Sequence, residues 1–83
     1  MKHTLSIAIL DDHSITIDGY RQRLAQDPDL TIAWTAAYGE ELPPLMDAQP
    51  VDVLILDISV PTSANNPSLY PILDVLPQLL ERH

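Results

Sequence analysis

The sequence predicts a small α/β domain built on a parallel sheet. Two apolar runs, residues 5–10 and 51–56, are each followed directly by an aspartate. Apolar runs of this length that end in turn residues and carboxylates are typical of buried strands in a parallel sheet. Helix-like segments alternate with the strand-like ones along the chain, and this alternation predicts parallel strands joined by right-handed crossovers.

The first half of the chain predicts a strand, a helix and a second strand. After the strand at residues 5–10, Ser14 is a candidate N-cap for a helix over about residues 15–26. One face of this helix would carry three large side chains at helical spacing: Ile17, Tyr20 and Leu24. The Asp-Pro-Asp sequence at residues 27–29 would end the helix, and residues 30–35 alternate between apolar and polar side chains as an edge strand does.

The next part of the chain predicts a short helix and a third strand. Pro43 and Pro44 are tolerated only in the first turn of a helix, so the helix predicted over about residues 40–48 would begin late. Pro50 then precedes the third strand, residues 51–56.

The residues after the third strand predict a loop and then a helix that follows Pro71. The loop covers residues 62–67 and contains two asparagines. Pro77 lies inside the helical pattern and is expected to kink or split the helix. The helix would present a face of aliphatic side chains: Leu69, Ile72, Leu73, Leu76, Leu79 and Leu80.

Composition limits the classes of protein to which the chain can belong. Its 83 residues form one small domain with a marginal core. The chain has 12 acidic and 4 basic residues and a net charge of −8, which argues against nucleic-acid binding through a basic surface. Without cysteine, disulfides and thiol chemistry are excluded. No apolar run approaches the roughly 20 residues that span a bilayer, so we expect a cytoplasmic protein with no membrane contact.

The predicted sheet leaves one edge open. The third strand is apolar on both faces, yet no later segment has the pattern of a strand that could pair with its far side. A long apolar strand with a free edge favours pairing with another chain. We therefore expect a fragment of a larger domain or a domain completed by a partner. A homodimer or a domain-swapped association would form through the third-strand edge or the last helix.

Three aspartates are expected to meet at one edge of the sheet. Asp11 and Asp12 follow the first strand and Asp57 follows the third. Ligands of open α/β sheets bind beyond the carboxyl ends of the strands. Carboxylates that share a site repel one another unless a cation lies between them, and Mg²⁺ prefers such oxygen ligands. With the metal present, Asp57 could attack a phosphoryl group and form an acyl phosphate.

A less specific interpretation of the same residues stays open. Asp11 and Asp12 alone would be expected to form a solvated turn that caps the following helix, and the matching Asp57 is what favours a metal site. His13 follows the acidic pair. A single histidine at a strand-to-helix turn is more often structural than a ligand or an acid–base group.

These segments resemble the receiver domain of bacterial two-component response regulators. In that family one strand ends in an acidic pair, and another ends in the phosphoacceptor aspartate with a proline four residues later. Residues 9–13, Ile-Leu-Asp-Asp-His, match the first element, and residues 54–61, Leu-Ile-Leu-Asp-Ile-Ser-Val-Pro, match the second. Gly19 and the segments 27–30 and 38–41 are similar to the subfamily whose receivers precede a helix-turn-helix of the LuxR/NarL type. The resemblance covers nearly all of the chain but only the first part of the family's domain.

The resemblance implies a fold and a set of roles. The fold would be a flavodoxin-like, doubly wound parallel sheet that is incomplete, with strand order 2-1-3 present and strands 4 and 5 missing. Residues 1–83 would be the N-terminal part of a single receiver domain. Asp57 would accept a phosphoryl group from a sensor histidine kinase. Mg²⁺ would be held by Asp12 and Asp57, by Asp11 directly or through water, and by the backbone carbonyl of Ser59. The output would be transcription through a helix-turn-helix domain not in this chain, and DNA binding would belong to that domain.

The chain also departs from the family pattern. The Ser/Thr after the fourth strand and the Lys after the fifth lie in regions that this sequence does not include, so we expect the 83 residues alone to be phosphorylated poorly or not at all. The loop after Pro61 lacks the glycine that usually follows there. The alternative is a degenerate or truncated receiver that acts as an interaction or dimerisation module, and we expect Mg²⁺ affinity to separate the two.

An enzyme fits the sequence less well. A phosphatase of the haloacid-dehalogenase type also uses an aspartate at the end of a strand, but the usual second aspartate two residues later is Ser59 here. A nucleotide-binding Walker-B strand is excluded because the chain has only two glycines, Gly19 and Gly39, and no glycine-rich phosphate loop. We therefore expect a signalling domain without enzyme activity of its own.

Overall fold

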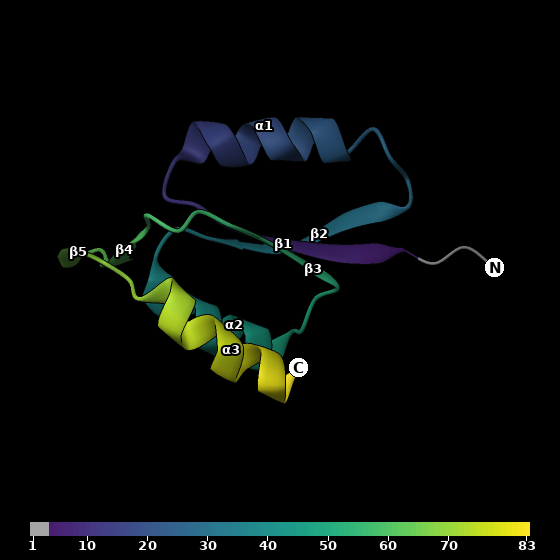
Figure 1. Cartoon of the computed structure of the whole chain (residues 1–83). Coiled ribbons are helices and arrows are strands. Elements are labelled where there is room, and N and C mark those ends of the chain that lie inside the picture. The colour runs from purple at the N-terminus through teal and green to yellow at the C-terminus, as the bar shows by residue number, and fades with distance from the viewer. Residues whose placement is uncertain (1–3) are drawn as a thin grey trace.

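A three-stranded parallel sheet is the centre of the computed structural model, which describes residues 4–83 (Figure 1). The strands, in the order β2-β1-β3, are β1 (Leu5–Leu10), β2 (Leu30–Ala36) and β3 (Val53–Leu56). Leu10, at the end of β1, lies opposite Ala36 of β2 and Leu56 of β3. The predicted α/β class and the strand order 2-1-3 are confirmed, and the carboxyl ends of the three strands meet at one edge of the sheet.

Helices cover both faces of the sheet. One face carries α1 (Ser14–Leu24), and the other carries α2 (Leu42–Ala48) and α3 (Ile72–Arg82) side by side (Figure 1). A 3-10 turn, η1 (Gly39–Glu41), leads directly into α2. No helix within residues 4–83 has the length and apolar character needed to cross a bilayer.

An ion pair joins the ends of α2 and α3. The Arg82 guanidinium donates hydrogen bonds to both carboxylate oxygens of Asp47, at 3.0 and 3.2 Å. His83 approaches the same carboxylate, with its Nε2 2.9 Å from Oδ1. These partly exposed contacts link the two helices on one face of the sheet.

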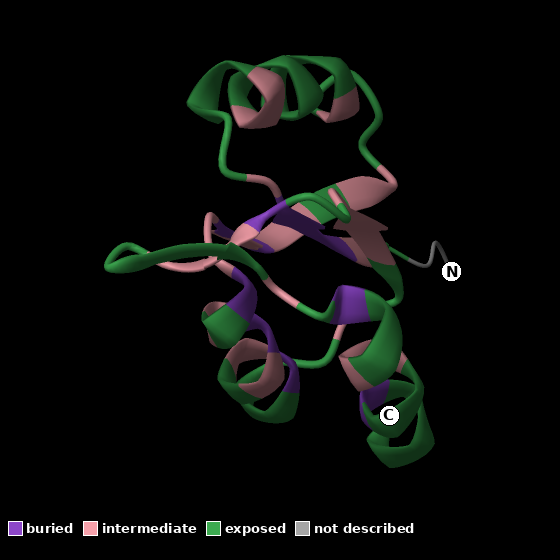
Figure 2. Cartoon of the chain, turned by 60° about the vertical axis from the view of Figure 1, so that its left-hand side comes forward, coloured by how far each residue is buried: buried purple, intermediate pink, exposed green. Residues whose placement is uncertain are grey.

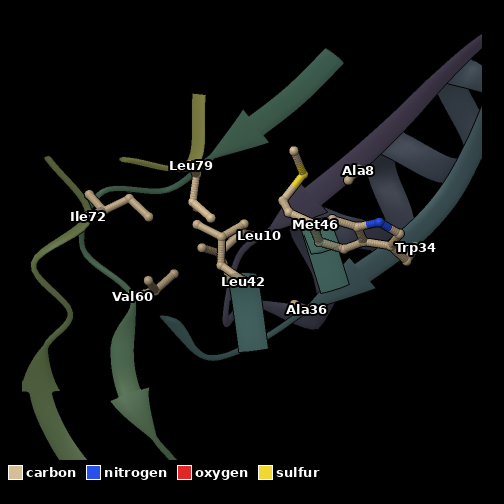
Figure 3. Packing of buried hydrophobic residues seen from close by; sticks show 9 residues of the cluster. All are labelled: Ala8, Leu10, Trp34, Ala36, Leu42, Met46, Val60, Ile72 and Leu79. Carbon is tan, nitrogen blue, oxygen red and sulfur yellow. The ribbon is translucent and has the colours of Figure 1, made fainter. Parts of the chain in front are cut away.

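The hydrophobic core lies mainly on the side of α2 and α3. One cluster of buried residues comes from the sheet, from these two helices and from the segment after β3, and its members are Ala8, Leu10, Trp34, Ala36, Leu42, Met46, Val60, Ile72 and Leu79 (Figure 3). Ile7 and Ile9 of β1 are also buried but lie outside this cluster. The Trp34 indole N–H donates to the Gln49 carbonyl at 2.9 Å, which satisfies the one polar atom of this side chain. On the other face, every residue of Ser14–Leu24 is exposed or half-buried (Figure 2). The two faces of the sheet are therefore covered unequally.

The first helix begins one residue earlier than the sequence predicts. Ser14 is its first residue, and His13 occupies the N-cap position without a side-chain hydrogen bond to the helix, so the predicted serine cap is wrong. The backbone explains the difference, because the His13 carbonyl accepts the amides of Thr16 and Ile17 at 3.1 and 3.2 Å and so begins the helical hydrogen bonding.

The segment predicted as a loop, residues 62–67, belongs to a hairpin. β4 (Pro61–Ser63) pairs antiparallel with β5 (Asn66–Leu69), so the prediction of a loop without strands is wrong. The base of the hairpin is tied to the core, because the Tyr70 amide donates to the carbonyl of buried Val60 at 3.0 Å.

The last helix runs through Pro77 without being split, so of the predicted kink or split the split is wrong and the kink stays a prediction. The proline removes one amide donor, but Leu73, whose carbonyl would have accepted that bond, is 68% exposed, so solvent is available there. The aliphatic face is narrower than predicted, because Ile72 and Leu79 are buried whereas Leu73 and Leu80 are exposed. Leu69, predicted to share this face, is the last residue of β5 and lies outside the helix.

The third strand has an open edge, as the sequence predicts. Within the described residues β3 pairs with β1 alone, and the hairpin forms a separate two-stranded sheet. Val53, at the start of β3, is 40% exposed.

Candidate metal site

Asp11 and Asp57 are placed by the last hydrogen bonds of the sheet. The Asp11 amide donates to the Ala36 carbonyl at 3.0 Å, and the Asp57 amide donates to the Leu10 carbonyl at 2.9 Å. Each aspartate thus continues the ladder by one residue before the chain leaves the sheet. Because β1 and β3 are parallel neighbours that end in register, their aspartates emerge side by side.

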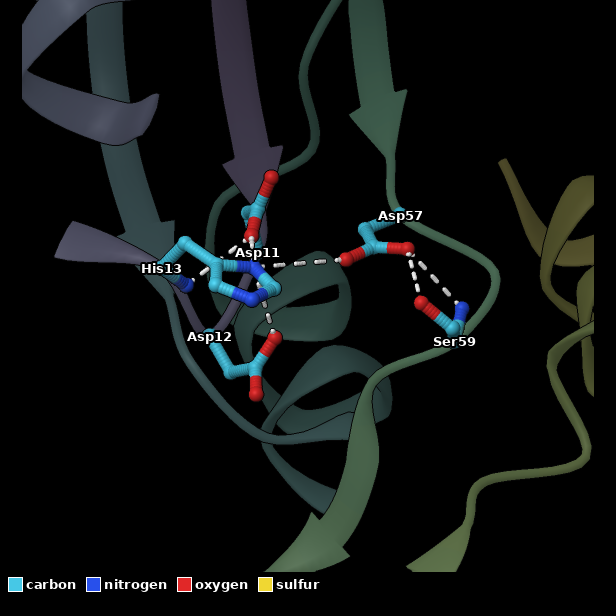
Figure 4. Close-up of polar contacts among 5 residues, drawn as sticks. All are labelled: Asp11, Asp12, His13, Asp57 and Ser59. Atoms are coloured by element: carbon cyan, nitrogen blue, oxygen red, sulfur yellow. Dashed lines mark hydrogen bonds and ion pairs between the residues drawn. The ribbon is translucent and has the colours of Figure 1, made fainter. Parts of the chain in front are cut away.

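Four side chains come together at this edge: Asp11, Asp12, His13 and Asp57 (Figure 4). One possible ligand atom of each lies within 4.8 Å of those of the others. The side chains of Asp11, Asp57 and Asp12 are 13%, 21% and 32% exposed, so solvent reaches all three carboxylates. The structure therefore brings together the three aspartates that the sequence singles out as metal ligands.

The imidazole of His13 lies among these carboxylates. Its Nδ1 is 2.9 Å from Asp11 Oδ1, 3.2 Å from Asp12 Oδ1 and 3.9 Å from Asp57 Oδ2. The hydrogen bond to Asp11 and the charge of Asp12 raise the pKa of His13 above its ordinary value. A protonated imidazole partly neutralises the cluster from the side where a cation would bind. The sequence alone favours a structural role for His13, and the one signal for its contact with the carboxylates is its place directly after the acidic pair.

Ser59 holds one oxygen of Asp57. Its hydroxyl and its amide both donate to Oδ1, at 2.7 and 2.9 Å (Figure 4). These two hydrogen bonds, the hydroxyl's first, lower the pKa of Asp57 below its ordinary value. Oδ2 remains on the side of His13. The sequence singles out the backbone carbonyl of Ser59 as a metal ligand, and that assignment stays a prediction, because the contacts with Asp57 run through the hydroxyl and the amide.

The donor set suits a hard divalent cation. Three carboxylates supply oxygen ligands, and the chain contains no cysteine that would favour a softer metal. Mg²⁺ usually takes one or two carboxylates and keeps several waters, which the exposure of this site permits. The residues present therefore fit Mg²⁺, and the cation would compete with the His13 imidazolium for the same oxygens.

Comparison with known proteins finds relatives among protein-glutamate methylesterases and response regulators, although no protein-family model matches the chain. Over 57 residues, 69% of the chain, it is 32% identical to protein-glutamate methylesterase/protein-glutamine glutaminase 1 of Bordetella avium, and the match covers 17% of that protein. Over 56 residues, 68% of the chain, it is 30% identical to the nitrate/nitrite response regulator protein NarL of Escherichia coli K12, with 26% of NarL covered. The chain thus spans about a quarter or less of the length of these curated relatives.

Solved structures of RcsB share the fold. RcsB from Salmonella enterica serovar Typhimurium, bound to promoter rprA in the presence of the phosphomimetic BeF3−, superposes with a TM-score of 0.74 and 22% identity over 92% of this chain and 38% of that one. A structure of two RcsB dimers bound to two parallel DNAs gives a TM-score of 0.73 and 23% identity over 98% of this chain and 38% of that one. The sequence match to a response regulator and the shared sheet agree, and the chain is homologous to the receiver domains of response regulators.

Proposed function

We propose that the chain is the phosphoacceptor part of a two-component receiver, in which Asp57 takes a phosphoryl group from a histidine kinase. One observation carries the proposal: the end of β3 delivers Asp57 into a cluster with Asp11 and Asp12 whose ligand atoms lie within 4.8 Å. The similarity to NarL, a response regulator by name, supports the same assignment.

The proposed chemistry is a phosphoryl transfer between two side chains. One oxygen of Asp57 would attack phosphorus, the bond from phosphorus to the kinase histidine nitrogen would break, and that nitrogen would keep the electron pair. Mg²⁺, when bound, neutralises charge on the phosphoryl oxygens. Asp12 and Asp57 would hold the cation, together with Asp11, directly or through water, and the backbone carbonyl of Ser59. The hydrogen bonds from Ser59 favour the ionised form of Asp57, which is the form that acts as a nucleophile.

The proposed partners follow from this role. A sensor histidine kinase would supply the phosphoryl group in the cytoplasm, and the output would be transcription through a further domain. RcsB is bound to DNA in the structures compared, but this chain covers 38% of it and has a net charge of −8, so DNA binding is assigned to another part of such a protein. The methylesterase relative is an enzyme by name, and the match covers 17% of it, so we propose no enzyme activity for this chain.

Mg²⁺ binding is the first test of the proposal. Titration of the purified chain, followed by NMR, should shift the amides of residues 11–13 and 57–59. Asp57→Asn removes one carboxylate charge from the cluster and should weaken Mg²⁺ binding about tenfold or more. The matched control is Asp18→Asn, which removes the same charge from an exposed position on α1 and should leave the affinity nearly unchanged. Equal affinities of the two variants would contradict the proposed site.

The acceptor role is tested by mass spectrometry after incubation with acetyl phosphate and Mg²⁺. We expect a small labelled fraction that Asp57→Asn abolishes, since the isolated 83 residues are expected to react poorly. Label that persists in Asp57→Asn would contradict the acceptor role. A large labelled fraction would support that role and overturn the expectation of poor reaction.

A second candidate function, an interaction module, is favoured by the open edge of β3 and by exposed Leu73 and Leu80 on α3. Such a module would form a homodimer or a domain-swapped assembly through that edge or that helix. Concentration-dependent association in light scattering, together with failure to bind Mg²⁺, would favour this function. A monomer at every concentration would count against it.

A further inference from the structure

We propose that the Ser59 hydroxyl is a positioning group for Asp57, which fixes the carboxylate so that Oδ2 faces the cation position and Oδ1 faces away from it. The inference rests on the proposed function, because it concerns how the two carboxylate oxygens of Asp57, the proposed acceptor, are oriented toward the proposed Mg²⁺ site. It concerns the side chain of Ser59, whereas the family resemblance assigns a role to the backbone carbonyl.

Two donors hold the same oxygen of Asp57 from different directions. The Ser59 amide donates to Oδ1 at 2.9 Å and the hydroxyl donates to it at 2.7 Å. Moving the side chain to another rotamer would break both hydrogen bonds at once. Oδ2 is left facing Nδ1 of His13 at 3.9 Å, and Figure 4 shows the two oxygens on opposite sides of the carboxyl group. The hydroxyl therefore acts on the cation site through the orientation of Asp57.

A serine two residues after the acceptor is what supplies the second bond. At Asp27, the amide of Asp29 donates to Oδ1 at 2.9 Å, but residue 29 has no hydroxyl to add another bond. At Asn66, the amide and the hydroxyl of Ser68 both donate to Oδ1, at 3.2 and 2.5 Å. The Asn66–Ser68 pair lies in β5 of the hairpin, outside the acidic cluster, and so provides a control with the same two hydrogen bonds.

An Asp57 carboxylate that is already oriented before the cation arrives should bind Mg²⁺ more tightly. A side chain that is already ordered loses less conformational freedom when it binds a ligand, and ordering one free side chain reduces affinity by roughly two- to tenfold. Removal of the hydroxyl should weaken Mg²⁺ binding by a factor in this range. The hydrogen bond from the backbone amide of residue 59 to Asp57 remains in Ser59→Ala, so the loss of affinity should lie toward the lower end of this range.

The test compares Ser59→Ala, Ser59→Thr and the control Ser68→Ala with the wild-type chain in two measurements. The first is the Mg²⁺ affinity from NMR titration. The second uses the metal-free protein, in which the three-bond couplings from the backbone N and C′ to Cγ of Asp57 report whether its side chain keeps one rotamer. Thermal melts of the variants check the fold, which exposed Ser59 should not govern.

The proposal expects weaker Mg²⁺ binding and averaged couplings in Ser59→Ala, and wild-type values in Ser59→Thr and Ser68→Ala. It is overturned by wild-type couplings and affinity in Ser59→Ala, or by a threonine variant that behaves like the alanine one. If the wild-type chain itself binds no Mg²⁺, the proposed cation site fails, and the metal-free couplings still decide whether Ser59 positions Asp57.

Discussion

His13 and Ser59 mark the limit of sequence reasoning at the scale of single residues. The meeting of Asp11, Asp12 and Asp57 could be predicted, because strands that run parallel bring their ends to one edge. The rotamer that turns Nδ1 of His13 toward the acidic pair depends on attraction within the folded cluster, and no periodic pattern encodes it. The hydroxyl bond from Ser59 to Asp57 depends likewise on the local turn geometry.

The titration of His13 is the prediction that belongs to this scale. NMR on the metal-free protein should give a pKa above the ordinary 6.5, because the hydrogen bond to Asp11 and the charge of Asp12 favour the imidazolium. Asp11→Asn should return the pKa toward 6.5, and saturating Mg²⁺ should also lower it, since the cation takes up the same carboxylates. A metal-free value at or below 6.5 would contradict the geometry of the cluster.

The raised pKa of His13 also determines how the stability of the fold depends on pH. A group whose pKa is raised on folding contributes stability that is fully present below the unfolded value, here about 6.5. That contribution is lost as the pH rises through the higher pKa of the folded state. Chemical unfolding at a series of pH values should therefore show that the free energy of unfolding falls as the pH rises through the folded-state pKa of His13. Asp11→Asn should make this fall smaller.

At the scale of elements, apolar runs and helical spacing were enough to predict the parallel sheet and its three flanking helices. They did not predict the β4–β5 hairpin, because its prolines and asparagines are equally suited to an irregular loop. The hairpin depends on a tertiary anchor, the bond between Tyr70 and buried Val60. The continuity of α3 through Pro77 likewise depends on the exposure of Leu73 to solvent, which cannot be predicted from the sequence.

Two glycines allow a matched test of how the elements pack. Gly39 is buried at the start of η1, and a methyl group there would overlap the Cβ and ring of Tyr70. Gly39→Ala should lower the free energy of unfolding by about 1–3 kcal/mol, because the base of the Tyr70 side chain cannot swing away. Gly19 lies in α1 with nothing near its added methyl group, so Gly19→Ala should raise stability by up to about 1 kcal/mol. Urea unfolding followed by circular dichroism measures both, and a Gly39→Ala variant as stable as Gly19→Ala would contradict this packing.

At the scale of the whole molecule, the unequal covering of the two faces of the sheet predicts where the protein opens first. None of the residues Ser14–Leu24 is buried, and a groove of about 390 Å³ separates the end of α1 from β2, lined by Arg21, Leu24, Ala25, Leu30, Thr31 and Ile32. Segments with few buried contacts open locally at less cost than global unfolding. Amide hydrogen exchange should therefore be faster in α1 than in β1, and equal protection of the two would contradict the unequal covering of the sheet.

The net charge of −8 makes the stability of the whole molecule depend on ions in two separable ways. NaCl should stabilise the fold of the wild-type chain and of Asp57→Asn alike, because it screens the repulsion among 12 acidic residues. MgCl₂ at the same ionic strength should add a further increment in the wild-type chain, about 1.4 kcal/mol when the free ion is at ten times its dissociation constant. Asp57→Asn should keep the response to NaCl and lose most of this increment, whereas Asp18→Asn should keep both. If urea unfolding shows the same increment in Asp57→Asn as in Asp18→Asn, Mg²⁺ acts by general screening and the acidic edge of the sheet is not a specific cation site.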